Sequence, residues 1–273
     1  MRRRFFVERF EGDSATIRGD TAEHLGRVLR AEQGQIYELS DGHRVWLARI
    51  ERVALSKRGE DRIEFALLEP IEAVAPSLHL SLLVSIVKYD RFEWCLEKAT
   101  ELGVDEIVPL AAARTDKPLV AAAGKRQERW NRILLESAQQ SRRLRPPVLR
   151  PAESPAGAFA NSTASAKIFL SERREVQPLR EILRRDSPLV AQATLPALRH
   201  DGPVRPSSPA EAEATAAPTV SLAVGPEGGW TDAETAAART NHFLEVSLGA
   251  NVLRTETAVI ASLAILKFTL GTD

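Results

Sequence analysis

The chain has 273 residues, 44% of them hydrophobic and 27% charged, enough for one large globular domain or two modest ones. Lysine and arginine together number 37, and so do aspartate and glutamate, so the formal net charge is zero. A zero net charge excludes a chain-wide positive field, so any surface for nucleic acid must be a local patch.

Cysteine, histidine and hydropathy patterns exclude further classes of protein. The single cysteine, Cys95, rules out an intrachain disulfide and a multi-thiolate metal site. The five histidines are scattered without zinc-ligand spacing, so we expect no metal. The start of the chain lacks the apolar stretch of a signal peptide, and no uncharged apolar run reaches 18 residues. We therefore expect a soluble, cytoplasmic protein with no membrane segment.

Residues 1–72 contain short strand-like runs separated by turn signals such as Asp41-Gly42, a pattern that predicts a small β-barrel. A helical insert at residues 22–30 interrupts the strands, and residues 72–77 read as a linker. The expected strands lie at residues 5–7, 15–17, 35–39, 44–50 and 62–67.

From Leu78 onward, strands alternate with helices, which predicts an α/β domain with a mostly parallel sheet covered on both faces. Between residues 186 and 218 the periodicity disappears and Ala, Pro, Ser and Arg dominate, so we expect a mobile insertion there. A strand at residues 188–191 is possible within it. The expected strands are 78–87, 106–110, 167–170, 220–224 and 243–248, and the expected helices are 89–102, 126–141 and 256–270.

The most informative motif is the glycine-rich run 225–229, which follows the apolar strand 220–224 directly. Glycine has no Cβ, so a strand that ends in three glycines within five residues lets a ligand approach bare backbone. Thr231 and Glu234 then fit a capping box at the start of a helix. A second strand and turn follow, with Gly249 at the turn, so two glycine turns can face one ligand.

The last expected helix, 256–270, is apolar nearly all round. Such a helix must be buried on most sides, against the sheet, against a partner subunit, or against both. We expect the second contact of this helix to be a partner subunit in a homodimer.

Several chemistries are disfavoured by what the sequence lacks. It contains no phosphate-loop motif, no dinucleotide fingerprint after an early strand and no Gly-x-Ser-x-Gly elbow. Cys95 lies within an expected helix, where a packed thiol is the better interpretation. A glycine-lined pocket without metal or nucleophile suits a ligand that carries its own reactivity, such as S-adenosylmethionine.

Several motifs together resemble the ribosomal RNA small-subunit methyltransferase E family, part of the SPOUT superfamily. The resemblance covers both expected domains and excludes only the 186–218 insertion. It is carried by the runs 224–231 and 247–258, by Lys98-Ala99-Thr100-Glu101-Leu102-Gly103-Val104, by His24-Leu25-x-x-Val28-Leu29-Arg30 with Gly34, and by Arg129-Trp130 through Gln140-Ser141.

The resemblance implies a PUA-like β-barrel at residues 1–72, which binds RNA, and a SPOUT domain at 76–273 tied in a deep trefoil knot. It implies a homodimer that methylates N3 of a uridine in 16S rRNA, within the small ribosomal subunit, with S-adenosylmethionine as cofactor. The family usually has a basic residue where this chain has Asn251. The implied cofactor-binding residues are Leu170, Ser171, Val224, Gly225, Pro226, Glu227, Gly228, Gly229, Leu248, Gly249, Val252, Leu253 and Thr257, with the strand end continuing to Glu172.

Two side chains near this pocket are candidates for catalysis. Arg254 is the first candidate for orienting the uracil or stabilising its developing anion, and the alternative is a structural pair with Glu256 or Glu227. Glu227 can hold the glycine loop or help to remove the N3 proton, and we favour the first role.

Positive charge gathers in one segment. Residues 114–150 hold ten lysines and arginines against three acidic residues, and further arginines crowd the start of the chain. Such a run is either an RNA-binding patch or a solvated helix face. The expected RNA-binding residues are Arg2, Arg3, Arg4, Arg9, His24, Arg27, Arg30, Arg114, Arg142 and Arg143.

Two other functions stay open at this point. One is an enzyme of the same fold that methylates a ribose 2′-hydroxyl or a tRNA base. The N-terminal barrel argues against it, because His24, Arg27 and Arg30 look like those of the rRNA-specific family. The other is a non-catalytic ribosome assembly factor, which would require a degenerate pocket, whereas both glycine motifs are intact.

Overall fold

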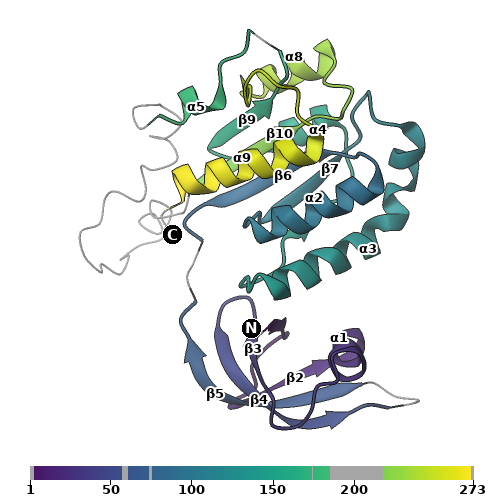
Figure 1. Ribbon diagram of the computed structural model, residues 1–273, viewed down its shortest axis with the longest axis vertical. Helices are drawn as coiled ribbons and strands as arrows, with labels where there is room; N and C mark the ends of the chain where they lie inside the picture. The colour runs from purple at the N-terminus through teal and green to yellow at the C-terminus, as the bar shows by residue number, and fades with distance from the viewer. Residues whose placement is uncertain (1–2, 57–60, 74–75, 174, 185–217, 272–273) are drawn as a thin grey trace. The chain divides into compact units, whose positions relative to one another are not determined.

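A computed structural model describes residues 3–56, 61–73, 76–173, 175–184 and 218–271. Within them the chain forms two compact units (Figure 1). The first unit is drawn from residues 1–75 and 135–146, and the second from residues 76–134 and 147–273. The expected insertion at 186–218, with its possible strand at 188–191, lies outside the described residues apart from its last position.

The first unit is built on a mixed sheet with strand order β1-β3-β4-β5-β2. β1 pairs with β3 in parallel, and the other pairs are antiparallel. Two register shifts between β4 and β5 increase the local bend, and the concave side buries side chains such as Phe5, Ile50 and Phe65. The strands are β1 (Arg4–Phe6), β2 (Ser14–Arg18), β3 (Ile36–Ser40), β4 (Val45–Ala54) and β5 (Arg62–Ile71).

The expected helical insert is present but irregular. It consists of α1 (Gly19–Glu23) followed by the π-helical turn η1 (His24–Val28). Arg30, just after it, has a φ of 53°, in the left-handed region that ends helices. The insert buries Ala22 and Leu25 against the sheet.

The second unit contains a sheet with strand order β11-β9-β10-β6-β7-β8. Every strand pair in it is parallel, so the expected parallel α/β architecture is confirmed. The strands are β6 (His79–Ser85), β7 (Glu106–Leu110), β8 (Val148–Leu149), β9 (Ala166–Leu170), β10 (Thr219–Val224) and β11 (Leu244–Val246).

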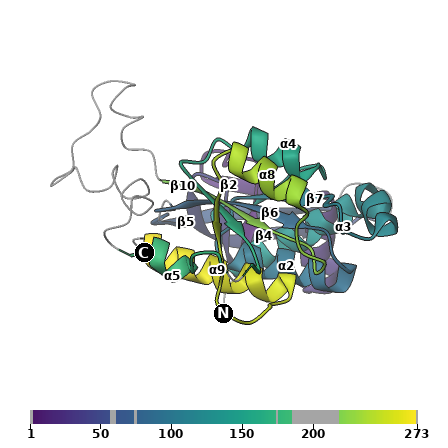
Figure 2. The same ribbon diagram turned by 90° about the horizontal axis from the view of Figure 1, so that it is seen from above.

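Helices cover both faces of this sheet (Figure 2). One face packs against α2 and α9, and α3 packs on α2 through Trp130 and Phe92, whose ring centroids are 4.7 Å apart. The other face packs against α4 and α8, which contact each other. The helices are α2 (Tyr89–Glu101), α3 (Lys117–Gln140), α4 (Pro155–Asn161), α5 (Leu179–Ile182), α8 (Asp232–Thr240) and α9 (Thr255–Leu270).

The structure departs from the expected elements in two respects. Helix α3 begins at Lys117 and not at residue 126, because Pro118 suits a first helical turn and the apolar run after it also forms helix. The short elements β8, α4 and α5 were not anticipated. Helix α9 is present as expected; within the single chain one side of it is buried, and Ile265 and Phe268 on the other side are 40% and 90% exposed.

Candidate functional site

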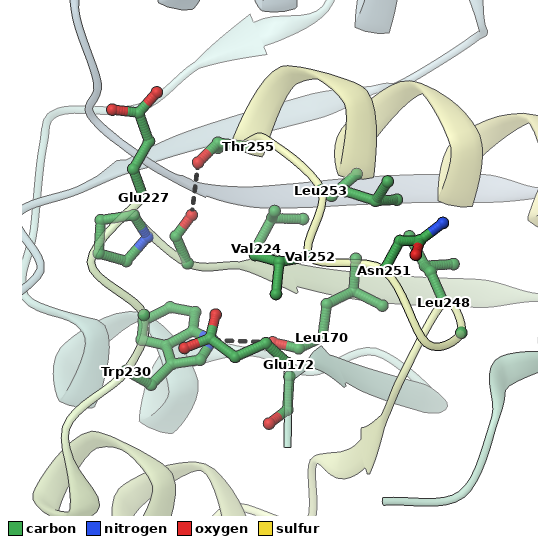
Figure 3. Close-up of a pocket in the computed structure, with 16 residues that line it drawn as sticks. Leu170, Glu172, Val224, Glu227, Trp230, Leu248, Asn251, Val252, Leu253 and Thr255 are labelled. Carbon is green, nitrogen blue, oxygen red and sulfur yellow. Dashed lines mark hydrogen bonds between the residues drawn. The ribbon is translucent and has the colours of Figure 1, made fainter. Parts of the chain in front are cut away.

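A pocket lies at the carboxyl ends of β9 and β10, where two loops and the start of α9 converge (Figure 3). Ligands of open parallel sheets usually bind at this end of the strands. The pocket is lined by Leu170, Ser171, Glu172, Val224, Gly225, Pro226, Glu227, Gly229, Trp230, Leu248, Gly249, Asn251, Val252, Leu253, Thr255 and Ala258.

Most of the residues expected at the cofactor pocket therefore lie together. Gly228 and Thr257 are the exceptions, since neither lines the pocket. Glu172, expected at the strand end, also lines it, and the residues that had not been assigned to it are Trp230, Asn251, Thr255 and Ala258, all within two positions of an expected one. The glycine-rich runs in the sequence predicted where the loops lie, but they did not predict which neighbouring side chains would point into the pocket.

Trp230 explains why the loop needs glycine at 225. The Trp230 indole Nε1 donates a hydrogen bond of 2.8 Å to the backbone oxygen of Leu170, which ties the loop after β10 to the end of β9. A Cβ at Gly225 would lie 2.8 Å from the Trp230 ring, closer than real Cβ contacts. The Thr255 hydroxyl donates to the Gly225 carbonyl oxygen at 2.9 Å, so the start of α9 is attached to the same loop.

The capping box at α8 is confirmed. The Thr231 hydroxyl accepts a hydrogen bond from the Glu234 amide, and the Glu234 carboxylate accepts one from the Thr231 amide. The other Glu234 oxygen accepts from the Ala113 amide at 2.8 Å. The helix that follows the glycine loop is therefore fixed at its start to the segment after β7.

A charged cluster beside the pocket involves a residue that the sequence analysis missed. Arg91 on α2 contacts the Glu227 carboxylate, and its Nε lies 3.9 Å from Glu256 Oε1. Glu227 and Glu256 thus both face Arg91 and not Arg254. Arg254 is exposed and, among the described residues, its guanidinium makes no ion pair or hydrogen bond.

Cys95, one helical turn after Arg91, is a buried thiol. Burial, with a smaller contribution from the Glu256 carboxylate, raises the pKa of the Cys95 thiol to about 12. A thiol that stays protonated is a packing group and not a nucleophile. The interpretation of Cys95 as a packed thiol is consistent with this environment.

Comparison with known proteins decides the family. The sequence profile of the RNA methyltransferase domain matches residues 74–267. The ribosomal RNA small subunit methyltransferase E of Synechocystis sp. is 32% identical over 258 residues, covering 92% of this chain and 72% of the relative. This chain belongs to the ribosomal RNA small subunit methyltransferase E family. The resemblance expected from the sequence motifs is thereby confirmed, and the chain is an RNA methyltransferase.

Solved structures agree with this family. The crystal structure of a ribosomal RNA small subunit methyltransferase E from Neisseria gonorrhoeae bound to S-adenosyl methionine has a TM-score of 0.74 and 27% identity, covering 99% of both chains. A Legionella pneumophila protein in complex with the bound cofactor SAM has a TM-score of 0.75 and 27% identity over 100% of both chains.

The arginines expected to bind RNA divide into two groups in this methyltransferase. Arg4 belongs to the first group, because it donates to the buried Glu38 carboxylate at 3.0 Å and to the Arg142 backbone oxygen at 2.6 Å. Arg142 Nη1 lies 3.5 Å from the same carboxylate. Arg27 pairs with Asp61 at 3.3 Å. These guanidiniums are engaged inside the first unit.

The members of the second group differ in exposure and in their contacts. Arg3 and Arg30 are exposed, and Arg9 is exposed beside Glu11. His24 and Arg143 are partly exposed. Arg2 lies outside the described residues. In the second unit, Arg114 is exposed and donates to the Gly228 carbonyl oxygen at 2.8 Å, so it braces the glycine loop.

The described part of the chain has no group of three or more His, Cys, Asp or Glu side chains that could hold a metal ion. Over the same residues, no helix is long and apolar enough to cross a membrane.

Proposed function

We propose that this enzyme transfers a methyl group from S-adenosylmethionine to N3 of a uridine in 16S rRNA. The observation that carries the proposal is the pocket at the ends of β9 and β10, in a chain that belongs to the ribosomal RNA small subunit methyltransferase E family. Such an enzyme would work where ribosomes are made, in the cytoplasm, on rRNA or the small ribosomal subunit.

The residues of the pocket suit this cofactor. Leu170, Val224, Leu248, Val252 and Leu253 offer apolar walls for an adenine ring, and the glycine turns offer backbone donors and acceptors for its polar edge. Bound S-adenosylmethionine supplies a methyl group already activated by its sulfonium. The protein therefore has to hold and orient the reactants and to exclude water.

Arg254 and Glu227 take different roles in this proposal. Arg254 follows the second glycine turn as the N-cap residue of α9, with an exposed guanidinium that has no partner in the described part of the chain. It can therefore reach an incoming uracil and stabilise the anion that develops on it. Glu227 already contacts Arg91, so it holds the loop to α2 and is not our candidate for the base that removes the N3 proton.

Two features of the fold belong to the same proposal. We infer that the second unit is a SPOUT domain with a deep trefoil knot, supported by the order β9-β10-β6 and by the two loops that meet at one pocket. We infer that the mixed sheet of the first unit is a PUA-like barrel that contacts the RNA. Arg3 and Arg30 are the residues of that unit best exposed for phosphate contact.

A homodimer is the remaining part of the proposal. Phe268 on α9 is 90% exposed, and Val252 at the rim of the pocket is 76% exposed. Ile265, three positions before Phe268 on the same helix, is also exposed, and neighbouring exposed apolar side chains favour an interface, so we expect a second copy to cover this side of α9. Light scattering on the purified protein should give twice the monomer mass, and Phe268→Asp should shift it toward the monomer.

The decisive experiment is methylation of small subunits and of free 16S rRNA from a strain that lacks the enzyme. With S-adenosylmethionine present, mass spectrometry of the digested RNA should find one new N3-methyluridine. A methyl group on a ribose, on another base or on tRNA would contradict the assignment of the substrate. If the folded protein bound the cofactor but transferred no methyl group, the assignment as an enzyme would be contradicted.

A further inference from the structure

The charges that line the cofactor pocket are all negative. Of the side chains on its surface, Glu172 and Glu227 are ionisable carboxylates, and no lysine, arginine or histidine is among them. Glu227 is compensated by Arg91. Glu172 makes no hydrogen bond or ion pair within the described residues, and its neighbour Arg173 pairs instead with Asp232 at 2.5 Å. The pocket therefore presents one uncompensated carboxylate.

The packing around Glu172 makes room for this carboxylate. Gly229 has a φ of 70°, and a Cβ at that position would overlap the Glu172 carboxylate oxygen. Figure 3 shows the Glu172 side chain beside the ring of Trp230 and next to Leu170, on the side of the pocket formed by the ends of β9 and β10. The carboxylate is exposed, so a ligand in the pocket can reach it, and solvent screens part of its field.

We propose that Glu172 distinguishes the cationic cofactor from the spent product, an inference that rests on the proposed function. The amino and carboxylate groups of the methionine part nearly cancel each other in both ligands. The sulfonium is then the difference between them, since S-adenosylmethionine carries a net positive charge and S-adenosylhomocysteine none. A lone carboxylate attracts the first and is indifferent to the second. Glu172 thus favours exchange of the product for fresh cofactor.

The test is isothermal titration of both ligands into the full chain and two variants. Glu172→Gln removes the charge and keeps the shape of the side chain. Glu175→Gln removes the same charge from an exposed position three residues away that does not line the pocket. Because Glu172 is itself exposed, solvent screens it, and we expect Glu172→Gln to weaken S-adenosylmethionine by up to about fivefold. Binding of S-adenosylhomocysteine should change by less than about twofold, and Glu175→Gln should leave both affinities unchanged.

A second measurement uses salt. Raising the ionic strength should weaken S-adenosylmethionine in the unaltered protein and have less effect in Glu172→Gln, because screening acts on the charge that the variant lacks. Circular dichroism and thermal melting establish that the variants are folded.

The outcomes separate the two proposals. An equal loss of both ligands in Glu172→Gln would overturn the inference, since it would mean that Glu172 supports the pocket or faces the amino group. An unchanged affinity for S-adenosylmethionine would overturn it as well. If the unaltered protein bound neither ligand, the proposed cofactor itself would be overturned. That result comes from the unaltered protein alone and does not depend on the variants.

Discussion

The pocket of the second unit and the arginines of the first unit were both anticipated from sequence, yet the structure treats them differently. At the pocket, nearly all the expected residues line one cavity. Among the arginines, Arg4 and Arg27 pair with acidic residues, whereas Arg3 and Arg30 are exposed and form no ion pair within the described residues. A binding loop is specified by consecutive residues. An arginine is available to bind RNA only if no acidic residue, which can be distant in the sequence, already pairs with it.

The largest expected effect is on turnover, and it shows whether catalysis at a pocket formed largely by backbone depends on one charged side chain. Arg254→Ala removes the exposed guanidinium at the start of α9. We expect kcat to fall by about 10²–10³-fold, the loss typical of a removed group that stabilises developing negative charge. Cofactor affinity measured by calorimetry should stay within about twofold, because the wall residues of the pocket are unchanged.

The matched control for Arg254 is Arg173→Ala. Arg173 is also an exposed arginine near the pocket, but it pairs with Asp232. It should keep most of the turnover. If Arg254→Ala weakened the cofactor as much as it slowed the reaction, Arg254 would be a binding residue and the catalytic assignment would be wrong.

The next effect tests whether the backbone of the glycine loop is as important as its position suggests. Gly225→Ala places a Cβ 2.8 Å from the Trp230 ring, so the ring or the loop must shift. We expect about a 10-fold loss of cofactor affinity, together with a change in tryptophan fluorescence. Gly124→Ala on α3 is the control, because a Cβ there meets no atom within 4 Å. It should leave binding unchanged and, if anything, stabilise the helix. Normal binding by Gly225→Ala would show that the loop adapts.

Two adjacent arginines, Arg3 and Arg4, test the difference between exposed and ion-paired arginines in the first unit. Arg4→Ala leaves the buried Glu38 carboxylate with the more distant Arg142 guanidinium as its one remaining cationic partner among the described residues. We expect a loss of about 1–3 kcal/mol in the free energy of unfolding measured with urea. Arg3→Ala should change that free energy by less than about 0.5 kcal/mol and should instead weaken RNA binding.

The RNA measurement completes this pair. If Arg3 contacts a phosphate, Arg3→Ala should reduce the slope of log affinity against log salt by about 0.7–0.9. Arg4→Ala should leave the slope unchanged at temperatures where it is folded. The reverse result would mean that Arg4 leaves Glu38 when RNA binds, and the comparison of buried and available arginines would fail.

These contrasts show which parts of the molecule were accessible to sequence reasoning. The ends of β9 and β10 were predictable, because an apolar run followed by glycines is a local signal for a strand and a binding turn. Arg91 was not predictable, since the residue that it contacts, Glu227, is 136 positions away. The pairing of Arg4 with Glu38 escaped for the same reason. The short helix α4 was missed because seven residues are too few for a periodic pattern, although Ser154 caps it.

The smallest expected effect concerns Cys95, a neutral group in the interior beside the cluster of Arg91 and Glu256. In the folded chain, burial raises the pKa of the Cys95 thiol from 9.0 to about 12. Between these values the unfolded chain has lost the proton and the folded chain has kept it. Stability from this group is therefore complete below pH 9 and falls as the pH rises, by about 1.4 kcal/mol per pH unit.

Comparison with Cys95→Ala isolates that term from other groups that titrate in alkali. The variant should be less stable by a constant amount below pH 9, because it loses buried packing. Above pH 9 its free energy of unfolding should fall less steeply than that of the unaltered protein, so the two curves converge. Parallel curves from pH 8 to pH 10.5 would mean that the thiol ionises in the folded chain as readily as in the unfolded chain. The interior around Cys95 would then accommodate a negative charge, as the first unit accommodates the buried Glu38 carboxylate.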